Sequence, residues 1–216
     1  MAFPVDIPIL LAFCAASMAL LVIPGPTIIM VVAQALAHGR RVALASVAGV
    51  GLGDFIAASL SLVGVGTVLA ASATAFTVVK WAGAAYLVWI GIKMWRAPVS
   101  PVLSGLAAGE AVPVIRHGAV FRDAFLVTLF NPKGIVFFMA FVPQFIVPSQ
   151  AFAPQAAVFV TVFTLLGILN AAAYALLAGS ARQAIRRPAV LKAATRTGAG
   201  FLISAGLASL MVKRAA

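Results

Sequence analysis

The sequence predicts an all-α integral membrane protein with about six transmembrane helices. Hydrophobic residues make up 64% of the chain and charged residues only 9%, and the mean hydropathy of +1.16 lies far above that of an ordinary soluble domain. A hydrocarbon core of about 30 Å needs roughly 20 apolar residues per helix. Short polar breaks divide the chain into six stretches of about this kind: 9–37, 42–71, 76–95, 124–147, 154–181 and 198–212.

The first stretch is interrupted at 24–26 by Pro-Gly-Pro, and the fourth at 131–134 by Asn-Pro-Lys-Gly. Because proline has no N–H, the first break leaves the carbonyls of Leu20 and Val22 without helical donors, and the second does the same to Thr128. A packing kink would explain one such break. Two breaks at matching places favour a binding site built from broken helices, because lipid tolerates free backbone groups only where protein or a watery cavity satisfies them.

The second stretch contains "GVGLGD" at 49–54. A dinucleotide-binding fingerprint needs a strand before it and a helix after it, whereas these glycines lie inside an apolar stretch. Gly49 and Gly53 are about one helical turn apart and therefore share a helix face. We expect them to allow close packing against another helix.

The connection at about 97–121 contains three prolines and few large apolar residues, so it is the natural boundary between two halves. We expect a single membrane domain, 1–216, with halves at about 1–96 and 122–216. Three spans in each half give the halves opposite orientations, so they form an inverted 3+3 repeat with broken first and fourth helices.

The distribution of cations predicts that both termini lie outside the cytoplasm. Most Lys and Arg residues fall in the connections on one side, whereas the turns near 72–75 and 148–153 have none. The positive-inside rule makes the basic side cytoplasmic. Lys213 and Arg214 fit this arrangement poorly. They leave open a five-span alternative in which one terminal segment does not cross.

Asp54 and Lys133 are the only charged residues well inside the predicted spans, and they have opposite signs and come from different halves. At about 1.5 Å per residue, both lie near the bilayer midplane, together with Gly25 and Asn170. A static ion pair that fixes helix packing is one interpretation. The other is functional: Asp54 takes up a proton or a substrate ammonium, and Lys133 holds a substrate carboxylate, helped by the N-terminus of the half-helix that begins at Pro132.

Other classes of function lack a signal in the sequence. There is one cysteine, Cys14, and only two histidines, His38 and His117, so no cluster has metal-ligand spacing. No hydrolase, zinc-protease or phosphate-loop motif occurs. The sequence therefore indicates no enzyme, no cofactor and no metal site, and the cations are topology signals rather than a nucleic-acid surface.

Three segments, "PGPTIIMVVAQALAHGRRVALASVAGVGLGD", "WAGAAYLVWIGIKMWR" and "FRDAFLVTLFNPKGIVFFMAFVPQF", together resemble the LysE-type superfamily of lysine exporters and homoserine/threonine resistance proteins. The resemblance extends from about residue 9 to 216. It implies a small prokaryotic inner-membrane carrier that exports amino acids or their derivatives, driven by the proton motive force. The positions that match the superfamily's motifs are Pro24, Gly25, Pro26, Gly53, Asp54, Asn131, Pro132, Lys133 and Gln144.

Our interpretation is a secondary exporter in the lipid bilayer that moves small amino-acid substrates and protons. The candidate residues for binding substrate or protons are Pro24, Gly25, Pro26, Asp54, Asn131, Pro132, Lys133 and Asn170. Two alternatives stay open: a metal-cation exporter of the same superfamily and a non-transporting membrane scaffold. The transported amino acid, the proton stoichiometry and the oligomeric state, a homo-oligomer included, are also open.

Overall fold

The computed structural model describes residues 4–71, 73–96 and 116–178, together with residues 192–193, 196–197, 199–200, 203–204 and 207. The elements are, in chain order, α1 (Ile7–Val22), α2 (Pro26–His38), α3 (Arg40–Ala71), α4 (Ala73–Arg96), α6 (His117–Leu129), α7 (Pro132–Val136), the π-helix η1 (Phe137–Phe141), the 3₁₀-helix η2 (Val142–Phe145) and α8 (Phe152–Leu177). All regular structure in the described part of the chain is helical, which confirms the predicted all-α class.

Three of the described helical segments are long and apolar enough to cross a membrane: Arg40–Thr67, His117–Phe145 and Phe152–Leu177. The pair formed by α1 and α2 makes a fourth if it is counted as one broken span, and its two parts meet at 56°. The predicted third span corresponds to α4, whereas the predicted last span, 198–212, lies mostly outside the described residues. Six spans and an inverted repeat therefore stay predictions.

Both predicted breaks occur, and local chemistry explains each. Helix α1 ends at Val22, Ile23 adopts an extended conformation, and α2 restarts with proline at its first position and Gly25 as N-cap. Helix α7 also starts with proline. Its N-cap is Asn131, whose side chain accepts a hydrogen bond of 3.1 Å from the backbone N–H of Lys133.

The start of the fourth span was predicted too late. Helix α6 begins at His117, within the predicted connection 97–121 and well before the predicted start at 124. Its first two turns contain the polar residues Arg122 and Asp123, which are exposed and paired with each other. A count of apolar residues misses such a turn, because the charged groups reach water at the end of the helix.

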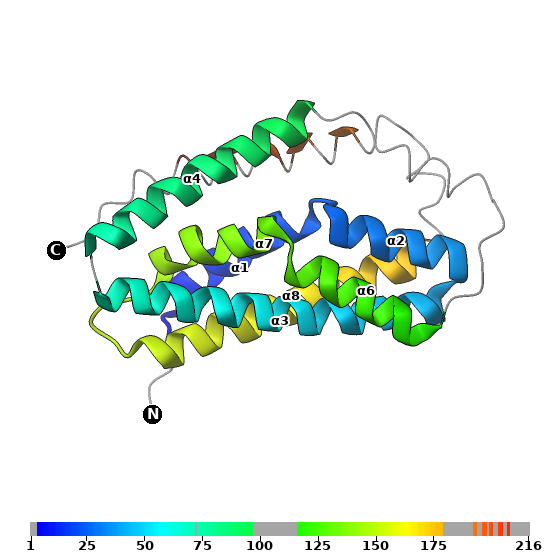
Figure 1. Cartoon of the computed structure of the whole chain (residues 1–216), viewed down its shortest axis with the longest axis horizontal. Helices are drawn as coiled ribbons and strands as arrows, with labels where there is room; N and C mark the ends of the chain where they lie inside the picture. The colour runs from blue at the N-terminus through cyan, green and yellow to red at the C-terminus, as the bar shows by residue number, and fades with distance from the viewer. Residues whose placement is uncertain are drawn as a thin grey trace.

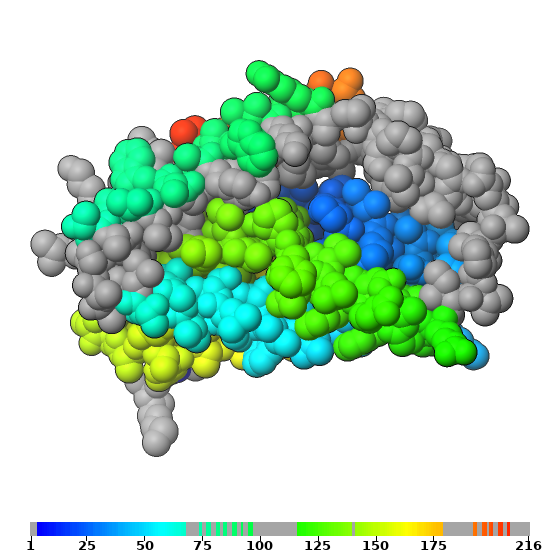
Figure 2. All heavy atoms as spheres, in the orientation of Figure 1, coloured from blue at the N-terminus to red at the C-terminus, as the bar shows by residue number. Residues whose placement is uncertain are grey.

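The long helices α3 and α8 pack against each other, and both breaks lie beside the middle of this pair (Figure 1). Helix α6 packs along the first half of α3, and the two are in contact on the face shown in Figure 2. Helix α4 lies on the other side of the broken helices and contacts η1 and α7. The fold thus brings the two interruptions together inside the bundle.

Two apolar clusters lie on either side of the breaks. The first, which we call the aromatic cluster, joins α1, η1, η2 and α8 through phenylalanines that include Phe13, Phe137, Phe138, Phe159 and Phe163. The second, the small-residue cluster, joins α2, α3, α6 and α8 mainly through alanine and valine. In it, a Cβ on Gly49 would collide with the carbonyl oxygen of Phe121. The predicted close packing of Gly49 and Gly53 against another helix is therefore confirmed.

Candidate functional site

A small pocket lies where the two breaks meet. Its volume is about 30 Å³, and its polar lining comes from four separate segments: Gly25 and Thr27 at the first break, Asp54 on α3, Asn131 and Lys133 at the second break, and Asn170 on α8. Leu20, Leu21, Ile28, Val50 and Phe163 supply apolar walls. This volume holds about one or two water molecules, far less than a pocket for an organic ligand. In this structure the pocket is therefore too small for an amino acid.

Of the eight candidate residues from the sequence, five line this pocket: Gly25, Asp54, Asn131, Lys133 and Asn170. The three prolines do not. Pro24 is partly buried, and Pro26 and Pro132 are exposed. Their role is indirect, because they end one helix and start the next and so leave backbone groups free beside the pocket.

Lys133 is buried, with 8% of its surface exposed. Its Nζ donates hydrogen bonds to the carbonyl oxygens of Leu20, at 3.0 Å, and Ile23, at 3.1 Å. A charged ammonium inside the membrane is costly unless polar groups replace its water. The end of α1 supplies such groups, since its free carbonyls carry the negative end of the helix dipole.

The two carbonyls between these are also satisfied by side chains. Asn170 Nδ2 donates to the carbonyl of Leu21 at 3.0 Å, and the hydroxyl of Tyr174 donates to that of Val22 at 2.8 Å. Four consecutive carbonyls, Leu20 to Ile23, thus accept hydrogen bonds from α7 and α8. We call them the carbonyl cluster. The expectation that protein groups satisfy the backbone freed at Leu20 and Val22 is confirmed.

A second polar group links the start of α2 to the second break. The hydroxyl oxygen of Thr27 accepts hydrogen bonds from Asn131 Nδ2, at 3.2 Å, and from the hydroxyl of Thr128, at 3.4 Å. The carbonyl of Thr128, predicted to be free, accepts from the backbone N–H of Asn131 at 3.0 Å. Each break therefore holds the other in place.

Asp54 differs from all these residues, because its Oδ2 is buried without a hydrogen-bond partner. The carboxylate of Asp54 lies so close to Gly167 of α8 that a Cβ on residue 167 would collide with it. Asp54 and Lys133 line the same pocket, but they do not form the ion pair that the sequence suggested. Lys133 binds the carbonyl cluster instead, which leaves Asp54 able to accept a proton or a cationic group.

Sequence reasoning missed four residues of the site: Thr27, Thr128, Gly167 and Tyr174. Two of them had a local signal. Thr27 follows the Pro-Gly-Pro directly, and Tyr174 lies one helical turn after Asn170, on the same face of α8. The sequence marked Thr128 only through its freed carbonyl, and nothing local marks its hydroxyl or Gly167 as part of the site, since these roles depend on side chains from α2 and α3.

The comparison with known families decides the class of the protein. A model of the LysE type translocator family matches residues 18–213, almost the whole chain. The chain belongs to this family. A LysE type translocator is a transporter, so this membrane protein is a transporter and not an enzyme.

Similar proteins carry more specific names. The homoserine/homoserine lactone efflux protein of Salmonella typhimurium is 38% identical over 185 residues, which cover 85% of this chain and 87% of that protein. The leucine efflux protein of Klebsiella pneumoniae is 32% identical and covers 72% of this chain and 71% of its own length. An uncharacterised membrane protein of Vibrio cholerae is 31% identical over 94% of this chain and 96% of its own. No solved structure matches the chain.

Proposed function

We propose that this LysE type translocator exports amino acids or their derivatives across the inner membrane of a prokaryote and is driven by the proton motive force. The observation that carries the proposal is the pocket at the two breaks, which is lined both by Asp54, whose Oδ2 is buried without a hydrogen-bond partner, and by the buried Lys133. Two opposite charges at one place in the membrane suit a zwitterion. The names of the relatives, which are homoserine and leucine efflux proteins, support the same substrate class.

In this proposal, Asp54 binds the substrate's ammonium or a proton, and Lys133 binds the substrate's carboxylate. In the pocket without substrate, Nζ of Lys133 donates two of its three N–H groups to the carbonyl cluster. Homoserine and its lactone both have a primary ammonium, but only homoserine has a free carboxylate. The ammonium is therefore the group that we expect every substrate to need.

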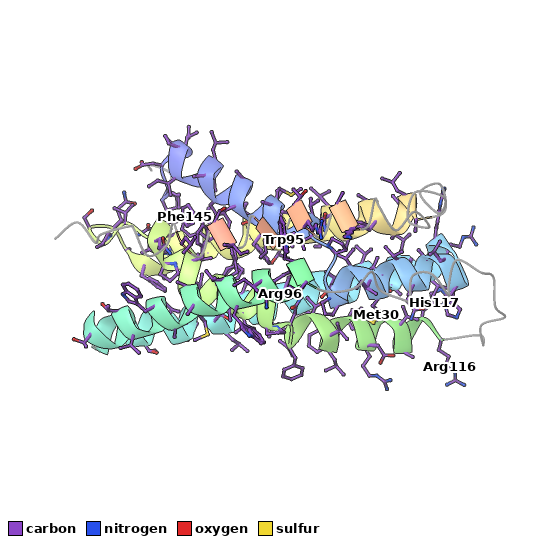
Figure 3. The ribbon with its side chains drawn as sticks, turned by 90° about the horizontal axis from the view of Figure 1, so that it is seen from above. Met30, Trp95, Arg96, Arg116, His117 and Phe145 are labelled. Atoms are coloured by element: carbon purple, nitrogen blue, oxygen red, sulfur yellow. The ribbon has the colours of Figure 1, made fainter. Side chains whose placement is uncertain are left out.

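The charge at the ends of the bundle indicates its orientation in the membrane, and hence the side from which an exporter takes its substrate. Arg116 and His117 lie at one end and Phe145 at the opposite end (Figure 3). Exposed Arg40 and Arg41 start α3 directly after α2 ends. Cations mark the cytoplasmic side of membrane proteins, so we propose that substrate enters at this basic end. Six spans in an inverted repeat, with both termini outside the cytoplasm, complete the proposal.

The test is efflux from cells that are loaded with a panel of dipeptides and compared with empty-vector cells. We expect faster appearance of one chemical class of free amino acid outside the cells, measured by mass spectrometry. Asp54→Asn and Lys133→Met should each reduce this efflux to the empty-vector rate. The matched control is Asp123→Asn, because Asp123 is about half exposed and pairs with Arg122 at the surface. It should export like the original chain.

Coupling to protons is tested with the purified protein in lipid vesicles. An imposed pH gradient should drive the exported amino acid against its own gradient, and a protonophore should abolish this accumulation. Wild-type chain that is well expressed but exports no amino acid would contradict the proposal. Cadmium tolerance of the expressing cells would then favour the metal-cation alternative, and a stable partner in pull-downs would favour the scaffold.

A further inference from the structure

In the carbonyl cluster at the end of α1, four consecutive carbonyl oxygens each accept a hydrogen bond from a side chain. Helix α1 stops at Val22, and Pro24 and Pro26 have no N–H to donate to the carbonyls of Leu20 and Val22. The four oxygens accept from two neutral side chains, Asn170 and Tyr174, and from one charged side chain, Lys133. The two outer carbonyls, of Leu20 and Ile23, are thus arranged around a primary ammonium.

The position of this ammonium suggests what else could bind there. Lys133 Nζ lies 3.4 Å from where a Cβ of Gly25 would be, and both residues line the pocket. The pocket, at about 30 Å³, has no room for an amino acid while the lysine stays there. A movement of Lys133 would enlarge the pocket and free the two carbonyls at the same time.

We propose that the carbonyls of Leu20 and Ile23, with the carboxylate of Asp54 in the same pocket, form the subsite for the primary ammonium of the substrate. Lys133 occupies this subsite when the pocket is empty. On loading, the substrate's ammonium takes the two carbonyls, and the displaced Lys133 binds the substrate's carboxylate. A primary ammonium has the same charge and the same three N–H donors as lysine, so the exchange leaves no carbonyl without a donor and no charge without a partner.

This inference rests on the proposed function, and it narrows the substrate class. Substrates need N–H groups on a cationic nitrogen. Amino acids and their esters or lactones meet this need, whereas N-acetylated amino acids have no cation and trimethylated ones have no N–H. If Lys133 instead only stabilises the break, the protein has no reason to prefer substrates with N–H groups on a cationic nitrogen.

The subsite itself is tested by restoring the missing ammonium to a purified Lys133→Ala variant. Its thermal unfolding is measured with ethylammonium chloride and with tetramethylammonium chloride at equal ionic strength. We expect ethylammonium to raise the unfolding temperature of the variant by about 3 °C, the shift for a ligand near ten times its Kd in a chain of this size. Tetramethylammonium should not raise it, and neither salt should raise that of the wild-type chain, in which Lys133 fills the subsite.

The substrate's use of this subsite is tested with the wild-type chain in lipid vesicles. Leucine methyl ester should inhibit amino-acid transport, and N-acetyl-leucine at equal concentration should not. If Lys133→Ala does not fold, Lys133→Cys in a Cys14→Ala background, alkylated with bromoethylamine, replaces it. Binding and transport should then return with the aminoethyl group and not with its trimethylated counterpart.

The outcomes separate the two proposals. Equal effects of primary and quaternary ammonium on Lys133→Ala, or equal inhibition by the ester and the N-acetyl compound, would overturn the subsite while amino-acid export still stood. Rescue of the variant by ethylammonium with no inhibition by the ester would assign Lys133 a bracing role only, which also overturns it. Absence of amino-acid transport by the wild-type chain would instead contradict the proposed function.

Discussion

The two sides of the pocket are packed in opposite ways. In the aromatic cluster, large rings fill the space between the helices, with centroids 4.7 Å apart for both Phe13–Phe159 and Phe138–Phe163. In the small-residue cluster, helices approach until backbone touches backbone, and glycine is needed at the contact between α3 and α6. One chain therefore uses both ways of holding helices together in a membrane.

The difference matters because the hydrophobic effect does not drive helices together in lipid. Packing contacts and hydrogen bonds must hold them together. In the aromatic cluster, large side chains make these contacts. In the small-residue cluster, the side chains are small enough for the helix backbones to make them. Substitutions should therefore act in opposite ways: smaller side chains should lower the unfolding free energy in the aromatic cluster, and larger side chains should lower it in the small-residue cluster.

The largest effect is expected from Gly49→Val in the small-residue cluster. Even the Cβ would collide with the carbonyl of Phe121, and a backbone group cannot move aside as a side chain can. We expect a loss of about 3 kcal/mol of unfolding free energy, the upper part of the usual range for overpacking. Denaturant unfolding of the purified protein in detergent measures it.

The control for this variant is Gly64→Val on the same helix, where Gly64 is exposed and a Cβ would meet nothing within 4 Å. It should be close to wild type in stability. Equal stability of the two variants would show that α3 and α6 are not held by close backbone packing.

A smaller effect is expected from Phe13→Ala in the aromatic cluster. Phe13 is fully buried and contacts Phe137, Phe145 and Phe159. In detergent, apolar surroundings solvate the unfolded helices too, so we count only the cavity: roughly 100 Å³ at about 24 cal/mol per Å³ gives a loss of about 2 kcal/mol. The same unfolding measurement applies, with Phe55→Ala, at a position 48% exposed, as control. A Phe13→Ala variant no less stable than this control would mean that the rings are not packed as described.

The smallest effect is expected at the boundary between the two sides, from Tyr174→Phe. This change removes only the hydroxyl that donates to the carbonyl of Val22. Hydrogen bonds between membrane helices contribute about 0.6 kcal/mol on average, and we expect a loss of that size. Thr161→Val, at an exposed position of the same helix, is the control. The maximum measured for such bonds is about 2 kcal/mol. A larger loss would show that the hydroxyl stabilises other carbonyls of the cluster besides that of Val22.

Several features of this protein could be predicted from the sequence because their causes are local. Overall hydropathy identified the membrane class. Local runs of apolar residues identified most helices, although they missed the polar first turns of α6. Proline has no N–H in any context, so both breaks and the freed carbonyls of Leu20 and Val22 were predictable. The cost of a charge in lipid marked Asp54 and Lys133, which do line one pocket.

Only the tertiary structure decided which groups meet. An ion pair with Asp54 was one of the two interpretations of Lys133, but its ammonium binds carbonyls more than a hundred residues away in the sequence. The space that Gly167 leaves for Asp54 had no local signal as part of a site. The physical reason is that a free carbonyl accepts from any donor within reach, so sequence can reveal the need for a partner, whereas the packing of the helices selects it.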